Sequence, residues 1–166
     1  SGAVAVALKH EAPFLEVWAS DISAEALEVA EANAARLLAD TPLRFLRGDL
    51  FEPVGPAFTC IVGNPPYIPS GEIGGLAPEV RKEPRLALDG GEDGLRILRR
   101  IIAGAPDHLC PGGTLLVEAD PRQMAELASL LETGGYEDIK IHRDLSGAER
   151  VIGGTRPGRH EQYKHG

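Results

Sequence analysis

The chain has 166 residues, of which 43% are apolar and 25% are charged, and its formal net charge at pH 7 is −8. This length and composition predict one soluble domain with a substantial core and exclude a disordered chain. The acidic balance disfavours a nucleic-acid backbone as the main partner, so we expect no direct nucleic-acid binding. No apolar run reaches the ~18 residues of a membrane span and no signal peptide is recognisable, so we expect a cytoplasmic protein without membrane contact.

Strand-length apolar runs alternate with helical periods almost from end to end, which is typical of an α/β fold. The clearest helix has Ser23 as a suitable N-cap and ends before Thr41-Pro42. The predicted helices cover residues 2–11, 23–40, 93–105 and 122–132. The predicted strands cover residues 16–20, 43–47, 58–62, 113–119, 137–143 and 149–152. From Thr155 to Gly166 the sequence is polar and without period, so we expect a loose C-terminal tail at 155–166.

The segment between residues 63 and 92 is rich in proline and glycine and is too irregular for a regular element. Its length exceeds that of an ordinary connection, which is typical of a functional loop. Within it, Gly90 to Gly94 is interpreted as a turn that opens the next helix. Parallel doubly wound sheets bind ligands at the carboxyl ends of their strands, and Asp21, Asp49 and Asn64 stand just after predicted strands. These three residues are the first candidates for a binding site.

The most specific motif is Asn64-Pro65-Pro66-Tyr67, directly after a predicted strand. Two prolines fix their own φ and remove two backbone donors, so the segment presents a rigid rim of hydrogen-bond acceptors. The Asn64 side-chain oxygen and the Pro65 carbonyl can together accept both hydrogens of a planar NH2 group, with the Tyr67 ring against its π system. The motif therefore favours an amide or aromatic amine as substrate, oriented without a titratable base. The alternative is a structural Pro-Pro turn.

Asp21 stands 19 positions after Gly2, close to the offset at which a carboxylate meets a ribose diol in dinucleotide-type folds. The alternative for Asp21 is a helix-capping role in the turn before Ser23. Asp49 is suited to accept from an adenine amine while Leu50 or Phe51 packs on the ring, and its alternative is an ordinary Gly-Asp turn.

No set of metal ligands is recognisable in the sequence. Cys60 and Cys110 lack partners at metal-ligand spacing, so we expect two buried thiols. The five histidines show no such spacing either and are interpreted as surface or tail residues. We therefore expect no metal cofactor.

Taken together, these motifs resemble the HemK family of release factor glutamine methyltransferases, which belong to the class I S-adenosylmethionine-dependent methyltransferases. The resemblance is carried by Asn64-Pro65-Pro66-Tyr67, by the Glu-Pro-x-x-Ala-Leu-x-Gly-Gly pattern within residues 80–91, and by Gly-Ala-Glu-Arg-Val at residues 147–151. It runs from Ser1 to about Gly154. It implies a Rossmann-like, doubly wound, mostly parallel sheet with a final antiparallel strand, and a catalytic domain at 1–154.

The resemblance also implies a reaction and a site. S-adenosylmethionine donates a methyl group to the side-chain amide of a glutamine in the Gly-Gly-Gln loop of a peptide-chain release factor. Its binding residues are Gly2, Asp21, Asp49, Leu50 and Asn64, while Asn64, Pro65, Pro66 and Tyr67 grip the glutamine and act in catalysis. Only Ser1-Gly2 matches the end of the family's glycine-rich cofactor loop, so we expect the first strand to be missing from this sequence and the domain to be truncated at its N-terminus.

Three other functions compete with this one. A methyltransferase acting on an exocyclic amine of a nucleic-acid base meets the same acceptor rim, but it requires a basic face that a chain at −8 does not offer. A catalytically silent methyltransferase-like binding module is supported by the partial glycine loop. A nicotinamide-dependent dehydrogenase has no need of Asn-Pro-Pro-Tyr.

Overall fold

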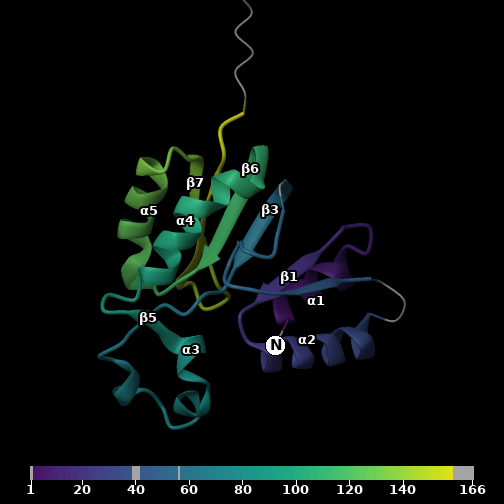
Figure 1. Cartoon of the computed structure of the whole chain (residues 1–166). Coiled ribbons are helices and arrows are strands. Elements are labelled where there is room, and N and C mark those ends of the chain that lie inside the picture. The colour runs from purple at the N-terminus through teal and green to yellow at the C-terminus, as the bar shows by residue number, and fades with distance from the viewer. Residues whose placement is uncertain (1, 39–41, 56, 159–166) are drawn as a thin grey trace, which may run out of the picture. The chain divides into compact units, whose positions relative to one another are not determined.

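The structure is a computed structural model and describes residues 2–38, 42–55 and 57–158 (Figure 1). The chain forms two compact units, unit 1 at Ser1–Gly55 and unit 2 at Pro56–Gly166. Among the described residues, no helix combines the length and hydrophobicity needed to cross a membrane.

Unit 1 consists of two helix–strand pairs. Its elements are α1 (Ala3–Glu11), β1 (Trp18–Asp21), α2 (Ala24–Leu37) and β2 (Arg44–Arg47). The two strands pair in parallel, with Asp21 opposite Arg47 at their carboxyl ends. Ser23 is the N-cap of α2, and its side chain accepts a hydrogen bond from the Ala26 amide at 3.1 Å, which confirms the predicted cap. A small apolar cluster holds the unit together and consists of Val6, Ala34 and Leu38, with Leu43 and Phe45 packed against it.

Unit 2 is built on a four-stranded sheet in the order β3-β6-β8-β7. The strands are β3 (Phe58–Gly63), β6 (Leu109–Glu118), β7 (Glu137–Arg143) and β8 (Glu149–Thr155). The pair β3 and β6 is parallel, while β8 runs antiparallel to both β6 and β7. The final strand is therefore antiparallel, as predicted.

Two helices, α4 (Arg96–His108) and α5 (Met124–Thr133), pack against this sheet (Figure 1). Helix α4 contacts β6, helix α5 contacts β7 and β8, and the two helices contact each other. The core between them contains fully buried aliphatic side chains: Leu98, Leu115, Val117, Leu127, Leu131 and Ile152. Tyr136 lies between α5 and β7 in the chain, and its hydroxyl donates to the Ile102 carbonyl of α4 at 2.9 Å. Burial raises the pKa of this phenol to about 12.

The proline- and glycine-rich segment contains more regular structure than expected. It forms β4 (Ile68–Pro69), the 3-10 turns η1 (Ile73–Gly75) and η2 (Val80–Lys82), α3 (Arg85–Leu88) and β5 (Asp89–Gly91). Strands β4 and β5 pair in parallel, which closes the segment into a loop. Elements of two to four residues are too short for any hydrophobic period, so the sequence pattern does not reveal them.

The predicted doubly wound, mostly parallel sheet is confirmed in part. In the described residues, unit 1 contains the parallel pair β1-β2, and unit 2 contains the mixed sheet β3-β6-β8-β7 and the separate pair β4-β5. Parallel pairing and the antiparallel last strand agree with the prediction, whereas the pair β4-β5 was not predicted. Hydrophobic patterns identify strands, whereas the pairing of one strand with another depends on tertiary contacts.

Two smaller expectations also need correction. Thr155 belongs to β8 and pairs with Thr114 and Glu137, and the Arg156 amide donates to the Gly113 carbonyl at 2.8 Å. The ordered strand thus runs past the predicted start of the tail, of which residues 159–166 lie outside the described part. Cys60 is exposed and Cys110 is half-buried, so the prediction of two buried thiols is wrong for Cys60 and holds only in part for Cys110.

Candidate functional site

The Asn64-Pro65-Pro66-Tyr67 segment leaves the sheet at the carboxyl end of β3. Gly63, the last residue of β3, pairs with Val117 of β6. Pro65 is buried, whereas the side chain of Asn64 is exposed and that of Tyr67 is half-buried. Because Pro65 and Pro66 directly follow Asn64 and restrict the backbone there, the Asn64 carboxamide is presented to solvent from a rigid base.

The main-chain carbonyl of Tyr67 is closely packed against Gln123 and Gly94. Its carbonyl oxygen accepts a hydrogen bond from the Gln123 side-chain amide, with Nε2 at 3.0 Å. The backbone of Gly94 approaches the same carbonyl so closely that a Cβ atom added there would lie 2.2 Å from the oxygen. Gly94 also has φ of 77°, a conformation that favours glycine. The turn predicted at Gly90 to Gly94 therefore packs directly against the Asn-Pro-Pro-Tyr segment.

Asp89 fixes the short β4–β5 pair that follows this segment. One carboxylate oxygen, Oδ1, accepts from the Ser70 hydroxyl at 2.5 Å and from the Gly91 amide at 3.0 Å, and Oδ2 pairs with Arg85 Nε at 3.0 Å. The Ser70 hydrogen bond, followed by those of Gly91 and Arg85, lowers the pKa of Asp89 to about 2. The ionised carboxylate thus stabilises the loop that carries the candidate site.

Replacing Asp89 with asparagine tests this arrangement. A carboxyl group with a lowered folded-state pKa stabilises the fold above its ordinary pKa, and that contribution is lost as the pH falls through the folded value. We therefore expect the wild type to be more stable than Asp89→Asn above about pH 4, with the difference vanishing between pH 4 and pH 2. Thermal unfolding from pH 2 to 7 measures it. Asp107→Asn, on the exposed side of α4, is the control, and a difference that does not change with pH contradicts the assignment.

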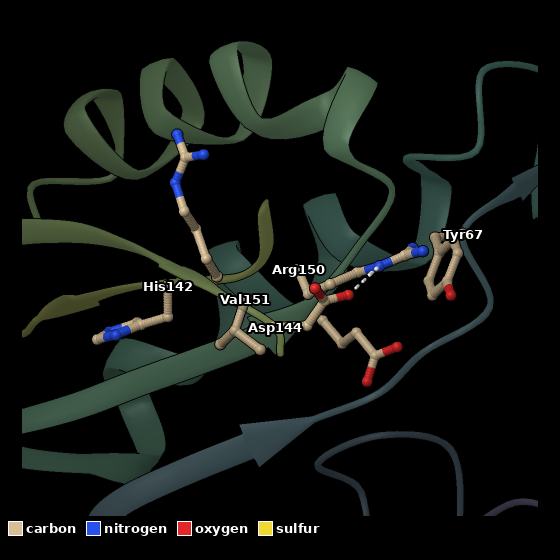
Figure 2. A pocket seen from close by; sticks show the side chains of 7 residues that line it. Tyr67, His142, Asp144, Arg150 and Val151 are labelled. Carbon is tan, nitrogen blue, oxygen red and sulfur yellow. Dashed lines mark hydrogen bonds and ion pairs between the residues drawn. The ribbon is translucent and has the colours of Figure 1, made fainter. Parts of the chain in front are cut away.

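A cavity of about 480 Å³ opens beside the Tyr67 ring (Figure 2). Glu118, the last residue of β6, forms one wall, and β7, β8 and the turn between them form the other. The residues lining the cavity are Tyr67, Glu118, His142, Arg143, Asp144, Arg150 and Val151. Figure 2 shows the Arg150 side chain extending from β8 toward the Tyr67 ring. Side chains of both charge signs therefore line the cavity beside Tyr67.

The electrostatics of this cavity keep the Tyr67 hydroxyl protonated. Burial raises the pKa of the Tyr67 phenol, and the negative charge of Glu118 raises it further, while Arg150 has the opposite, smaller effect. A neutral phenol next to a carboxylate and a guanidinium offers donors and acceptors for a polar ligand.

The turn between β7 and β8 is held by Asp144. Its Oδ1 accepts from the Ser146 amide at 2.8 Å, the Ser146 hydroxyl at 2.6 Å and the Ala148 amide at 3.0 Å. Its Oδ2 accepts from Arg150 Nε at 3.4 Å. These hydrogen bonds, that of the Ser146 hydroxyl first, lower the pKa of Asp144, so the carboxylate is ionised and orients Arg150 toward the cavity.

A second group of candidates lies in unit 1, at the carboxyl ends of the parallel strands β1 and β2. Asp21 ends β1, and its Oδ1 accepts from the Ser23 amide at 2.9 Å, which forms a turn just before α2, whereas the N-cap itself is Ser23. This contact uses one of the two carboxylate oxygens. The Gly48 amide donates to the Asp21 carbonyl at 3.1 Å, which brings Asp49 to the same edge of the sheet as Asp21.

The backbone around these acidic residues is unusual at two positions. Leu50 has φ of 54°, a conformation that costs a residue with a side chain about 1–2 kcal/mol. Its carbonyl accepts from the Ser20 hydroxyl at 3.2 Å. Gly2, the N-cap of α1, has φ of 67°, and a Cβ atom there would lie 2.6 Å from the Ala30 Cβ atom. Positive φ at a non-glycine residue is typical of functional sites.

The sequence-predicted residues thus fall into two groups, with Gly2, Asp21, Asp49 and Leu50 in unit 1 and Asn64 to Tyr67 in unit 2. Sequence reasoning missed Glu118 as a cavity residue, although the rule that selected Asp21 also applies to Glu118 at the end of its strand. It also missed Gln123, whose contact with Tyr67 joins residues 56 positions apart. In the described part of the chain, no cluster of three or more histidine, cysteine or acidic side chains is arranged to hold a metal ion.

Comparison with known proteins finds similarity to methyltransferases over the residues of both groups. Residues 1–76, which contain every predicted site residue, match the family described as "Methyltransferase small domain". The fold resembles a methyltransferase from Pyrococcus furiosus with a TM-score of 0.69 and 19% sequence identity, over 93% of this chain and 70% of that one. This likeness supports the fold.

The sequence similarity extends further along the chain. Release factor glutamine methyltransferase from Deinococcus radiodurans is 43% identical over 158 residues, which cover 95% of this chain and 56% of the relative. The protein of the same name from Gloeobacter violaceus is 46% identical, over 92% of this chain and 54% of the relative. The chain thus spans about half the length of the curated relatives it matches. Over that span, the sequence of the chain is similar to those of the release factor glutamine methyltransferases.

Proposed function

We propose that this chain transfers a methyl group from S-adenosylmethionine to the side-chain amide nitrogen of a glutamine in a peptide-chain release factor. The observation that carries the proposal is the exposed Asn64 on the rigid proline base at the carboxyl end of β3, beside the half-buried Tyr67 ring. The names of the relatives supply the substrate class, and the 41–46% identity supports carrying it over to this chain.

The chemistry of the Asn-Pro-Pro-Tyr segment suits a primary amide. Asn64 Oδ1 and the Pro65 carbonyl accept the two N–H groups of the substrate glutamine, and the Tyr67 ring packs on the amide plane. An amide nitrogen is a weak nucleophile because its lone pair is delocalised. The barrier to methyl transfer is lowered by orienting the amide and by hydrogen bonds from its N–H groups, which strengthen as positive charge develops on the nitrogen. The nitrogen gains the methyl carbon as the bond between that carbon and the sulfonium sulfur breaks, with S-adenosylhomocysteine as the leaving group. The nitrogen then releases one proton to solvent, which leaves a neutral secondary amide.

The residues of unit 1 fit the proposed cofactor by the chemistry of their acceptors. The Asp21 carboxylate suits the two hydroxyl donors of a ribose, and Asp49 suits the exocyclic amine of adenine, with the Leu50 side chain against the ring. When bound, S-adenosylmethionine supplies an activated methyl group on its sulfonium. Gly2 is the N-cap of α1, and a helix N-terminus that follows a glycine loop is a suitable place to bind part of a nucleotide-like cofactor.

The cavity of about 480 Å³ beside Tyr67 has the size of a ligand pocket and suits the peptide around the glutamine. Its wall carries Glu118 and Asp144 as acceptors and Arg143 and Arg150 as donors, which pair with the amides and carbonyls of an extended backbone. The arginines already have partners in the hairpin, so they are held in place before the substrate arrives.

The direct test is methyl transfer from radiolabelled S-adenosylmethionine to a release factor. We expect label on the wild-type release factor and none on a variant with its Gly-Gly-Gln glutamine replaced by alanine. Single-stranded DNA and RNA serve as competing acceptors. Label on nucleic acid, or on the glutamine-to-alanine protein, would falsify the proposal. Calorimetric binding of S-adenosylhomocysteine without any transfer identifies a silent binding module instead.

The cofactor assignment predicts a specific effect of Asp21→Asn. The side-chain oxygen of the new amide can still accept from the Ser23 amide, so the start of α2 is kept while the charge toward the ribose is lost. Hydrogen bonds to charged groups contribute about 1.5–3 kcal/mol, so we expect roughly 10- to 100-fold weaker binding of S-adenosylhomocysteine by calorimetry. Glu28→Gln makes the same charge change on the exposed side of α2 and is the control. Equal affinity in the two variants would remove Asp21 from the cofactor site.

A further inference from the structure

We propose that Gln123 is a positioning residue for the candidate active site, holding the Asn-Pro-Pro-Tyr segment in its productive position through the main-chain carbonyl of Tyr67. The proposal deepens the function proposed above and rests on it. Gln123 does not touch the predicted substrate amide; it acts through the backbone three residues beyond Asn64.

The side chain of Gln123 is fully engaged. It is 7% exposed, and its Nε2 donates to the Tyr67 carbonyl at 3.0 Å and to the Asp93 carbonyl at 3.3 Å. Its Oε1 accepts from the Asp120 amide at 3.1 Å. Two carbonyls on one side and an N–H on the other fix the orientation of the carboxamide, since only the NH2 group can donate to both carbonyls.

The main chain of Gln123 is fixed as firmly as its side chain. Gln123 is the last residue of the 3-10 turn η3 (Pro121–Gln123), which leads directly into α5. It forms a capping box with Asp120, whose side chain accepts from the Arg122 amide at 2.9 Å. The Gln123 side chain therefore reaches Tyr67 from a helix start that is itself anchored on the core of unit 2.

The space around the contact leaves no room for displacement. A Cβ atom on Gly94 would lie 2.5 Å from Gln123 Nε2 as well as 2.2 Å from the Tyr67 oxygen. The Tyr67 carbonyl is thus enclosed between the carboxamide and the Gly94 backbone. Because Pro65 and Pro66 lock the intervening φ angles, a shift of this carbonyl moves the Asn64 end of the segment as well. Functional groups must be held within about 0.5 Å for catalysis, which gives such an anchor a direct effect on rate.

The test is Gln123→Glu, which is nearly isosteric, keeps the acceptor for the Asp120 amide, and turns the donor toward Tyr67 into an acceptor facing two carbonyls. With ring-¹³C tyrosine in the whole chain, we expect the Tyr67 signal to move and the Tyr136 signal to stay, each assigned by its phenylalanine variant. We expect kcat for methyl transfer to fall roughly 10- to 100-fold, while KM for S-adenosylmethionine changes less than threefold. As the pH falls and the new carboxyl group is protonated, its hydroxyl donates again, so activity relative to wild type rises.

Glu132→Gln, an isosteric change at an exposed position near the C-terminal end of α5, is the control and leaves both readouts at wild-type values. If Gln123→Glu does not fold, shown by a lost Tyr136 signal, Gln123→Met removes the same hydrogen bonds without adding charge and takes its place. A folded variant with an unmoved Tyr67 signal, or with a moved signal and unchanged kcat, overturns the proposal. If the wild type transfers no methyl group, the proposed function fails, and the Tyr67 signal alone decides whether Gln123 anchors the segment.

Discussion

Replacing Asn64 with alanine is expected to lower methyl transfer at least about 100-fold, the scale on which loss of one preorganised polar group acts in other active sites. The reason is the exposed position of the carboxamide at the end of β3, where we propose that its oxygen accepts from the substrate amide. Those hydrogen bonds act on the nucleophile, so the affinity for S-adenosylhomocysteine should fall much less than kcat. Single-turnover transfer to the release factor and calorimetry measure the two effects separately.

Asn33 on α2 provides a matched control for this experiment, because Asn33→Ala removes the same side chain from unit 1. We expect its transfer rate to stay within a few-fold of the wild type. Unchanged turnover in Asn64→Ala would show that the Asn-Pro-Pro-Tyr segment is a structural turn.

Replacing Gly94 with alanine is expected to lower the free energy of unfolding more than any other substitution named above. The substitution has two separate costs: a φ of 77°, which costs alanine about 1 kcal/mol, and a Cβ atom placed 2.2 Å from the Tyr67 carbonyl oxygen. The groups that this Cβ atom would meet, the Tyr67 backbone and the buried Gln123 side chain, cannot relax easily, and overpacking of this kind costs about 1–3 kcal/mol more. Urea unfolding followed by circular dichroism measures the total.

Gly135 separates these two costs. It has the same φ of 77°, but nothing lies within 4 Å of its added Cβ atom, so Gly135→Ala carries the conformational cost alone. We expect Gly94→Ala to be less stable than Gly135→Ala by about 1–3 kcal/mol. Two variants of equal stability would mean that the Tyr67 carbonyl is free to move away from Gly94, and the close packing described above would be refuted.

Local sequence signals predicted most of the regular elements and the first candidates. The Ser23 cap lies where expected, and β3 ends at Gly63, just before the predicted break at Asn64-Pro65. Strand β6, by contrast, begins at Leu109, four residues before the predicted start, because Pro111 and Gly112 interrupt the apolar pattern. Such residues mark turns in most sequences, and here a register shift in the pairing of β3 with β6 accommodates the interruption.

The contacts that complete the candidate site could not be predicted in the same way. Gln123 reaches Tyr67 across 56 residues, and a buried glutamine at the start of a helix has the same local sequence whether it caps the helix or also binds a distant carbonyl. The orientation of Arg150 likewise depends on Asp144, at the other end of a turn. Spacing along the chain carries no information on such pairs, because they form only when the sheet and its helices pack.

The capping box between Asp120 and Gln123 has a consequence for how the protein opens. The helix that it begins, α5, carries Leu127 and Leu131 at 0% exposure, so its amide hydrogens are expected to exchange with solvent only when the core of unit 2 opens. Since Gln123 links that helix to Tyr67, the main chain of the Asn-Pro-Pro-Tyr segment shares its protection instead of fraying as a surface loop does. Heat or denaturant is therefore expected to release the Asn-Pro-Pro-Tyr segment together with the core of unit 2.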